Sequence, residues 1–480
     1  MRKYFLAYIL LTLSISGVYA QDTWDLRRCV DYAIANGISV KQADVQARIA
    51  ALNTKRAKAQ TYPTLNFSTQ GGYNLGRSIN PTNNQYTTSD VLFQNYTLSS
   101  NITVFNFFSL KNNHKAIATL EEANKIFVDA AKTNITLSVA NYYLNYLLSL
   151  ETANAAKLKV DLTRQQLGNT RKLVDAGSMP ELNAAQLEAQ LATDSSSYIT
   201  AMATADQNKI NLMGALSLDM ATPFEVSIPD VDKIPLEPIA ELQPGDVYQA
   251  ALGTQPQQKF DSLNVLAQQY TVKSTKAAQY PTISAFAQLG STYASTFANY
   301  AETYVPNGKF DTLGSVLVNG AKYYTTTPGY NINTTSTKIP YLTQVTNNNF
   351  TQAFGVTLNV PIANNRQLKT NYQIAKLNLE NFKLTQKQDD ITLQSNIYLA
   401  YSSAVSSLES YNAAVKAHQT QQYAYDLSKK RYDIGVLSTI DLILTENNLF
   451  TAEVTELSDK YNYVFRMKIL EFYKGQGVKL

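Results

Sequence analysis

The chain has few of the residue types that most catalytic and metal sites use. Its 480 residues include one cysteine, Cys29, and two histidines, His114 and His418. One cysteine excludes an intramolecular disulfide and a thiolate metal cluster, and two histidines are too few for a multi-histidine zinc site. Phosphate-binding GxxxxGKS or GxxxxGKT, zinc-peptidase HExxH and hydrolase GxSxG patterns are also missing from the sequence. We therefore expect no enzyme activity, no metal and no other cofactor.

Charged residues are also scarce. They make up 16% of the chain, against roughly 25% in an ordinary soluble domain, whereas 45% of the residues are hydrophobic and 32 are tyrosines. This composition is too apolar and aromatic for a disordered chain. The formal net charge is +4, or about +2 (4 − 2) without the leader residues Arg2 and Lys3, so no nucleic-acid partner is expected.

Residues 1–20 have the pattern of a cleaved signal peptide. Arg2 and Lys3 precede an apolar stretch from Tyr4 to Ile15, and Val18-Tyr19-Ala20 forms a small-x-small cleavage site. The apolar stretch is too short to span a bilayer core of roughly 30 Å as a helix, and no later apolar run reaches helix-spanning length. The sequence therefore predicts an exported protein without a transmembrane helix. Tilted strands of about ten alternating residues remain a second way to cross a bilayer.

The chain contains an internal duplication. The segment Ala59–Thr64 recurs as Ala277–Thr282, an offset of 218 (277 − 59), whereas Asp175-x-Gly177 recurs as Asp433-x-Gly435, an offset of 258 (433 − 175). The second copy therefore holds about 40 additional residues (258 − 218), which must lie between Pro281 and Leu368.

Alternating hydrophobic residues predict two strands in each copy. The period is two at about 64–74 and 95–105, and again at about 282–293 and 349–361, with one apolar face in each segment. A soluble antiparallel sheet packed on a core would show the same pattern. The leader and the long helices around these segments favour strands that cross a membrane.

Long segments with helical spacing follow the strands. From Lys111 to about Val174 only Gly168 interrupts the helix-forming pattern. Its apolar residues have the 4-3-4 spacing of coiled coils, and the same positions recur at offset 258; the two sets are Ile135, Val139, Tyr142, Tyr146 and Leu393, Ile397, Ala400, Ala404. Tight turns follow at 175–181 and 433–439, where Gly177 and Gly435 are suited to helix ends.

These patterns give the domain organisation. We expect a signal peptide at 1–20, a first repeat at 21–214, a connector at 215–245 and a second repeat at 246–480. The connector holds five of the 14 prolines, which excludes a continuous helix, and we interpret it as a linker rather than a recognition motif. Each repeat is predicted to contain a helix, two strands and a long helical hairpin.

With these motifs in this order, residues 24–475 resemble the TolC family of outer-membrane efflux proteins. The resemblance rests on Tyr62-Pro63-Thr64, on Tyr280-Pro281-Thr282 and on the turn segments 171–191 and 429–449. It implies a mixed fold, mainly α with membrane β. Three chains would form a 12-stranded β-barrel that continues as an α-helical barrel into the periplasm. Physical reasoning agrees, because four strands cannot close a barrel and unpaired edges in hydrocarbon are costly.

The resemblance implies a function in export. The chain would be the outer-membrane channel of a tripartite efflux or type I secretion system, a passive homotrimeric conduit surrounded by outer-membrane lipid. A periplasmic adaptor (membrane fusion) protein and an inner-membrane RND, ABC or MFS pump would open it. The alternative is an exported coiled-coil adhesin or scaffold with a soluble strand head. The exported substrate and the pump class stay open.

The resemblance also places the loops and the tips. Loops 75–93 and 294–348 would face outside the cell, and the longer one would serve as a surface cap or a receptor surface. The turns would meet the adaptor, and the candidate contact residues are Gly177, Ser178, Met179, Gly435, Val436 and Leu437. Ordinary hairpin turns explain the glycines equally well, whereas Met179 and Leu437, which we expect to be exposed, favour a partner.

A candidate pore gate follows the tips. Six residues after each tip glycine, members of the family often carry carboxylates that ring the pore entrance, and Asn183 and Asp441 occupy these places. Three copies of Asp441 around a threefold axis would form a negative constriction that attracts cations. Asp441 could instead cap the start of its helix. Leu444 stands where a further carboxylate can lie, so a double ring is not expected.

Overall fold

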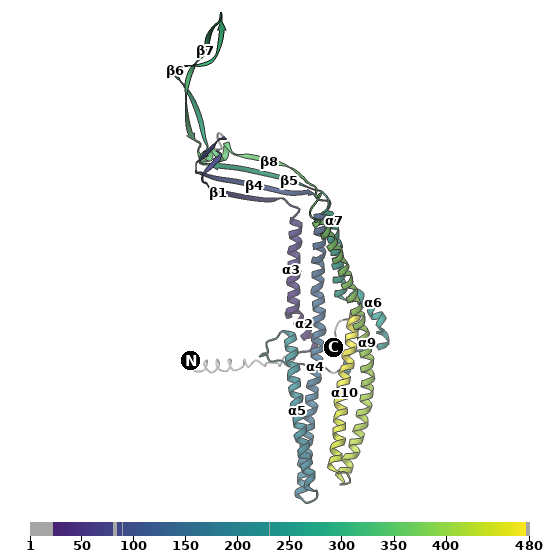
Figure 1. Ribbon diagram of the computed structural model, residues 1–480. Helices are drawn as coiled ribbons and strands as arrows, with labels where there is room; N and C mark the ends of the chain where they lie inside the picture. Colours follow the sequence, from purple (N-terminus) through teal and green to yellow (C-terminus); the bar gives the residue numbers. More distant parts are fainter. Residues whose placement is uncertain (1–22, 80–83, 89, 230, 477–480) are drawn as a thin grey trace, which may run out of the picture. The chain divides into compact units, whose positions relative to one another are not determined.

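The computed structural model describes residues 23–79, 84–88, 90–229 and 231–476. The predicted signal peptide, residues 1–20, lies outside the described residues. The chain divides into two compact units, and Figure 1 labels their longer helices and strands. A helical unit comprises the chain up to Thr54, Lys115–Tyr270 and the chain from Ala375, and a sheet unit comprises Lys55–His114 and Thr271–Ile374.

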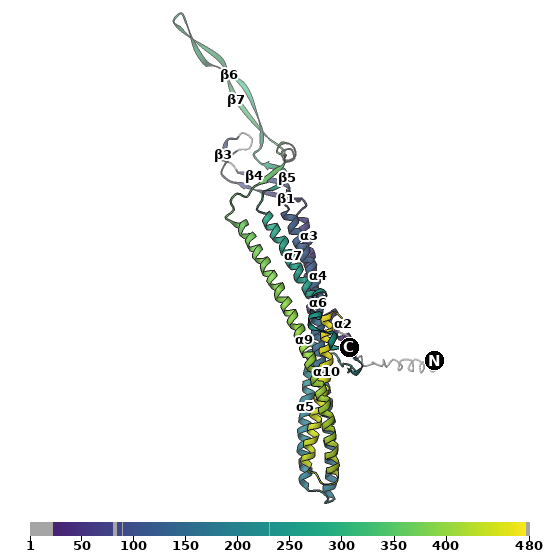
Figure 2. The same ribbon diagram turned by 90° about the vertical axis from the view of Figure 1, so that its right-hand side faces the viewer.

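Eight helices fall into two sets of equal lengths. The bounds are α2 Leu26–Asn36, α3 Ile38–Ala59, α4 Ser109–Asp175 and α5 Glu181–Leu216, then α6 Pro244–Thr254, α7 Pro256–Ala277, α9 Gln367–Asp433 and α10 Thr439–Lys474. Each set has helices of 11, 22, 67 and 36 residues. In the helical unit α4 with α5, and α9 with α10, form two hairpins (Figures 1 and 2). Within the described residues, no helix is both long and apolar enough to span a membrane.

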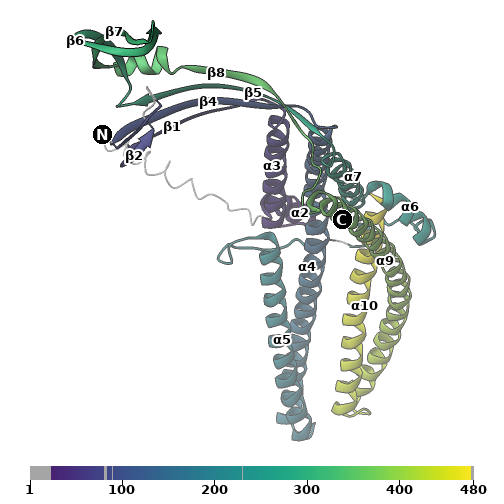
Figure 3. The same cartoon turned by 45° about the horizontal axis from the view of Figure 1, so that its top comes forward.

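The sheet unit contains a four-stranded antiparallel sheet. Its strands are β1 Thr64–Asn74, β4 Val91–Phe105, β5 Thr282–Ala294 and β8 Thr351–Asn359, in the order β1-β4-β5-β8 (Figure 3). β4 begins four residues before the expected start at residue 95, because Val91 to Gln94 also pair with β1. Short strands β2 (Arg77–Ile79) and β3 (Tyr86–Thr88) pair separately.

One face of this sheet is apolar and the other is polar. The register places cross-strand neighbours on a shared face, and the apolar face carries Leu65, Phe67, Tyr96, Leu98, Ile102, Ile283, Ala285, Leu289, Phe354, Val356 and Leu358. Phe354 is 88% exposed and Val356 70% exposed. Most of the apolar face is therefore not packed against a core of the described chain, contrary to the soluble-sheet alternative.

The stretch 294–348, expected as a long external loop, contains a two-stranded ribbon. β6 (Ala298–Val318) pairs with β7 (Ala321–Lys338), followed by α8 (Tyr341–Thr343) and a π-helical turn at Gln344–Asn348. The fully buried Gln344 anchors the ribbon base to the sheet. Its Oε1 accepts from the Ala294 N–H at 3.1 Å, and its Nε2 donates to the Ile339 carbonyl at 2.8 Å.

Strands β4 and β8 pass into long helices through the same backbone geometry. Phe107 and Phe108 precede α4 with φ of 50° and 63°, and Asn365 and Arg366 precede α9 with φ of 51° and 63°. Left-handed backbone at two successive non-glycine residues is costly. The ring of Phe107 packs 5.0 Å from those of Phe105 and Tyr280, which holds the first of these turns in place.

The main core of the helical unit lies where the connector crosses the helices. Trp24 and Val226 form a parallel bridge, and the hydroxyl of Tyr143 on α4 donates to the carbonyls of Trp24 at 3.3 Å and Ser227 at 2.7 Å. The connector is thus packed against α4 rather than being a free linker. Tyr142, one of the residues with the coiled-coil spacing, is 41% exposed, whereas its neighbour Tyr143 is buried, because the helix face that meets the connector is one residue further on.

Two carboxyl groups meet between α7 and α9 in the helical unit. Asp261 of α7 is 5% exposed, and the negative charge of Asp389 on α9 acts on its carboxyl group. Gln257 Nε2 also donates to Asp261 Oδ1 at 3.1 Å. The pKa of Asp261 is raised from 3.8 to about 7. Burial is the largest cause of this shift, and the charge of Asp389 is the next. Asp261 therefore keeps its proton up to about neutral pH.

Replacing this acid should change how stability depends on pH. An unfolded Asp releases its proton near pH 4, whereas native Asp261 holds it to about 7, so the stability of the unchanged protein should fall as pH rises between these values. We expect Asp261→Asn to flatten this slope and to stabilise the protein at pH 8 by about 1–3 kcal/mol. Circular-dichroism melts in detergent measure the effect. Asp161→Asn, at an exposed site on α4, should keep the original slope; an unchanged slope in Asp261→Asn would contradict the raised pKa of Asp261.

Candidate gate at the hairpin tips

The two tip turns have the same backbone geometry. Gly177 (φ 72°) and Gly435 (φ 76°) both adopt the left-handed conformation at the end of a long helix. The Ser178 N–H donates to the Leu173 carbonyl at 2.8 Å, and the Val436 N–H donates to the Arg431 carbonyl at 2.9 Å. These six-to-one hydrogen bonds are Schellman motifs, and the positive φ explains why glycine occupies both turns.

Asp441 takes part in the cap of α10. Ser438 precedes the helix, and its Oγ accepts from the Asp441 N–H at 3.2 Å and donates to Asp441 Oδ2 at 2.6 Å. This is a reciprocal capping arrangement, with an acidic residue in the first turn where it also interacts favourably with the helix dipole. The Asp441 side chain is exposed, and Asn183 on α5 is half-buried. A capping role for Asp441 is thus present, although the residue as a whole stays exposed.

The exposed apolar residues of the tips differ from those expected. Met179 and Leu437 are half-buried rather than exposed. Met179 turns inward because its Sδ accepts from the Tyr432 hydroxyl at 3.8 Å. Val436 is 63% exposed, and its neighbour Ile434, which the sequence reasoning did not select, is 74% exposed. The apolar surface that the second turn presents therefore consists of Ile434 and Val436.

Tyr432 connects the two hairpins near their tips. In addition to Met179, its hydroxyl lies 3.3 Å from Thr170 Oγ1 on α4 and 3.4 Å from Thr439 Oγ1 on α10. Further from the turns, a small apolar cluster joins Leu187 of α5 to Ile443 of α10. Sequence reasoning missed Tyr432, since a tyrosine in the last turn of a long helix gives no signal of its partner on another hairpin.

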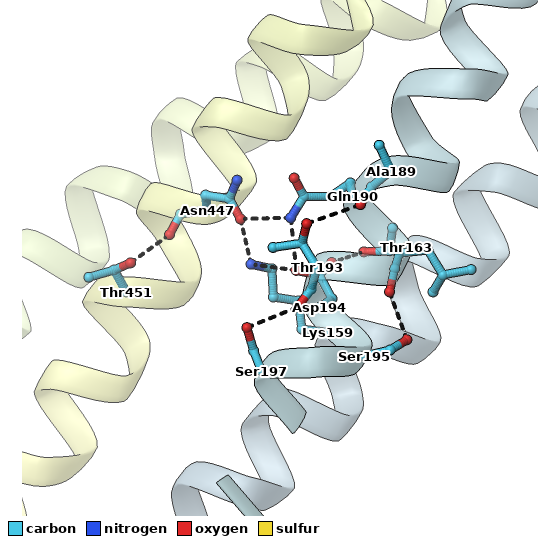
Figure 4. A network of polar contacts seen from close by, with 11 residues as sticks. Lys159, Thr163, Ala189, Gln190, Thr193, Asp194, Ser195, Ser197, Asn447 and Thr451 are labelled. Carbon is cyan, nitrogen blue, oxygen red and sulfur yellow. Dashed lines mark hydrogen bonds and ion pairs between the residues drawn. The ribbon is translucent and has the colours of Figure 1, made fainter. Parts of the chain in front are cut away.

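A buried polar network joins the hairpins further along α4. Asp194 of α5 is 2% exposed and lies 3.1 Å from Lys159 Nζ on α4. Its carboxylate also accepts from Thr163 Oγ1 at 2.7 Å and from Gln190 Nε2 at 2.8 Å. Asn447 Oδ1 on α10 accepts from both Lys159 and Gln190, so the network spans α4, α5 and α10 (Figure 4). A fully hydrogen-bonded buried charge of this kind fixes the register of packed helices.

A second buried carboxyl lies beside this network. Glu446 of α10 is 6% exposed, and its Oε1 has no hydrogen-bond partner. Burial raises the pKa of Glu446, whereas the hydrogen bond from Gln166 and the charge of Lys159 partly lower it. Lys159 also lies 4.7 Å from the centre of the Phe450 ring. Among the described residues, no group of three or more His, Cys, Asp or Glu side chains is arranged to hold a metal ion.

The network predicts the effect of removing its anion. Asp194→Ala removes the carboxylate that pairs with the largely buried Lys159 ammonium, which should cost about 3–5 kcal/mol and lower the thermal midpoint. The double variant Lys159→Met/Asp194→Leu should recover most of this loss, because both charges of the Lys159–Asp194 pair are removed together. Thr193→Ala, which removes a hydroxyl that bonds the Ala189 carbonyl on the exposed side of α5, should change stability by under about 0.5 kcal/mol. Equal midpoints for Asp194→Ala and Thr193→Ala would contradict a structural role for the network.

The fold of the chain is similar to that of several solved structures. The structure of CusC matches with a TM-score of 0.73 at 16% identity, covering 96% of each chain. The CmeC outer membrane channel of Campylobacter jejuni matches at 0.71 and 19% identity, covering 95% of this chain and 86% of that one. The outer membrane protein VceC of Vibrio cholerae matches at 0.71 and 13% identity, covering 95% and 97%. At these identities the matches establish the fold.

The family is established by sequence. No curated relative matches the chain. The family model for outer membrane efflux proteins matches residues 30–217 and 247–473, one segment in each half of the chain. The resemblance to TolC-family proteins and the outer-membrane location with a periplasmic helical part are confirmed by these findings. The chain therefore belongs to the outer membrane efflux protein family.

Proposed function

We propose that the chain is one subunit of a passive trimeric conduit, the outer-membrane part of a tripartite efflux or type I secretion system. The observation that carries the proposal is the four-stranded sheet with an exposed apolar face. Such a face is stable against lipid, and its end strands β1 and β8 need partners. Three copies would supply twelve strands (3 × 4), enough to close a barrel with an aqueous interior. The two helix sets of equal length would be tandem repeats that line the periplasmic part.

Opening would separate the hairpin tips. The Tyr432 contacts to Thr170 and Met179 involve single hydrogen bonds at a half-buried site, so they cost little to break. The Lys159–Asp194 network is more buried and more completely bonded. Lys159 lies 16 residues (175 − 159) before the end of α4, or about 24 Å along the helix. We therefore expect the tips to move while the hairpins stay joined at the network.

A periplasmic adaptor would drive this movement, powered by an inner-membrane RND, ABC or MFS pump. The turn residues Gly177, Ser178, Met179, Gly435, Val436 and Leu437 remain the proposed contacts, with Ile434 added. The support for an adaptor contact is the exposed apolar pair Ile434 and Val436. This pair lies at the second turn and suits an apolar partner. The pump determines the cargo, because a wide polar tunnel has little selectivity of its own. The β6–β7 ribbon would form part of a surface cap outside the cell.

Conductance tests the conduit. We expect the purified protein to insert into planar bilayers and give small single-channel currents, because the tips are closed. Tyr432→Phe removes the hydroxyl contacts between the hairpins, worth about 1 kcal/mol each, and should raise the mean conductance several-fold. Tyr423→Phe, at a 67% exposed site on the same helix, should conduct as the unchanged protein does. Absence of current from all three proteins would refute the channel.

Charge at Asp441 tests the gate separately from the helix cap. In Asp441→Asn the amide oxygen still accepts from the Ser438 hydroxyl, so α10 should keep its cap while the threefold ring loses its negative charge. We expect the thermal midpoint to stay the same and block by divalent cations to weaken by about tenfold. Asp433→Asn, on the other side of the turn, should leave the block unchanged. An unaltered block in Asp441→Asn would assign Asp441 to capping and remove it from the gate.

A further inference from the structure

A short segment lies over the apolar face of the sheet, at the end of β5 that leads into the ribbon. The Tyr341 hydroxyl lies 2.6 Å from that of Tyr96, and the Tyr341 ring packs 4.9 Å from the ring of Tyr293. One helical turn later, the Val345 carbonyl accepts from Ser291 Oγ at 2.6 Å. Tyr96, Ser291 and Tyr293 all belong to the apolar-face rows of the register. The segment Tyr341–Asn348, the overhang, is therefore fixed against this face of the sheet.

The overhang covers a groove. Its floor is one cross-strand row, in which Phe67 of β1 pairs with Leu98 of β4 and Leu98 pairs with Leu289 of β5. Val345 and Phe350 close its sides, and its volume is about 400 Å³. This lies in the range of small-molecule pockets, roughly 300–1,000 Å³. The groove is lined mainly by apolar side chains, with the hydroxyl groups of Tyr96, Ser291 and Thr346 at its edge, so it suits a ligand that is mainly apolar.

The position of the groove identifies its surroundings. In a protein of the outer membrane, an uncovered apolar sheet face contacts the hydrocarbon of the bilayer. Tyr96, Tyr293 and Tyr341 gather at the ribbon end of the groove, and tyrosines concentrate at the level of the lipid headgroups. The row Phe67–Leu98–Leu289 is the next row on the same face, two residues further from the ribbon than the Tyr96–Ser291 pair. With the tyrosines at headgroup level, this floor would lie where the acyl chains begin.

The same register argues against a second copy as the occupant. Sister chains would pair with the outer edges of β1 and β8, whereas the centre of the groove floor lies on β4 and β5, which already have neighbours on both sides. The overhang also projects from the apolar face and would obstruct close approach of another sheet. A flexible single chain of methylene groups can enter beneath it.

We propose that this groove holds one acyl chain of an outer-leaflet lipid, with its headgroup at the tyrosine cluster. The bound lipid would travel with the protein rather than exchange freely with the membrane. It would also cover Phe67 and Phe350, which are 66% and 44% exposed in the uncovered sheet. The overhang would then act as a clasp that fixes the depth of the sheet in the outer leaflet.

Retention of lipid tests the proposal. The assembled protein is extracted from its membrane in a mild detergent and exchanged exhaustively into a second detergent. Native mass spectrometry and lipid extraction then count the remaining lipid. We expect about one lipid per chain. Leu98→Trp fills the groove from its floor. It should lower lipid retention at least fivefold, because the acyl chain loses the burial of at least about one methylene group. Val356→Trp enlarges a side chain on the same apolar face outside the groove and should retain lipid as before.

A second variant covers the case in which Leu98→Trp fails to assemble. Val345→Asp places a charge in the groove wall from the overhang and leaves the strands unchanged, so it should also lose the lipid. Equal retention in Val345→Asp and the unchanged protein would overturn the proposal. So would an adduct with the mass of the exchange detergent, or equal loss in Val356→Trp. A protein that conducts current but retains no lipid would refute the groove and leave the channel function standing.

Discussion

The backbone groups along the outer edges of β1 and β8 are the constraint on which the structure depends. Each of these strands pairs with a neighbour on one side in the four-stranded sheet. In water the other N–H and C=O groups would bond to solvent, but in hydrocarbon each unmet group costs several kcal/mol. The chain places these edges on a sheet whose apolar face is exposed, so the edges and the face demand the same lipid environment. In the proposed trimer, copies of the chain would be the partners that meet both demands.

The long helices solve a related problem in water. A single helix of 67 residues has far more surface than one chain can bury. Its stability therefore depends on close side-by-side packing against other helices. Small residues at heptad spacing, Ala116, Ala123 and Ala130, are buried along α4, and buried polar groups appear where the hairpins meet. The Lys159–Asp194–Asn447 contacts fix the register of three helices, whereas Tyr432 makes weaker contacts near the tips. The contacts between the hairpins are thus stronger at the Lys159–Asp194–Asn447 network than near the tips. This difference suits hairpins that open at their tips.

The sequence predicted those features that depend on neighbouring residues. Alternation located the strands and the apolar face, since successive side chains in a strand point to opposite sides, and Gly177 and Gly435 marked turns because those turns need positive φ. Contacts between distant segments were not predictable in this way. Lys159 and Asn447 are separated by 288 residues, and neither type of residue reveals its partner. The 4-3-4 spacing included Tyr142 and not the buried Tyr143, because a spacing rule does not tell which helix face a connector will cross. The overhang Tyr341–Asn348 was missed because its polar sequence resembles that of a surface loop.

Cross-linking between β1 and β8 tests the central claim most directly. Cysteines introduced one at a time along residues 64–74 are each combined with Thr357→Cys on β8, in a Cys29→Ala background, and oxidised in the native membrane. If sister chains complete the sheet, a subset of adjacent positions will give a covalently closed trimer on a denaturing gel. Monomers at every position, or cross-links confined to one chain, would contradict the account.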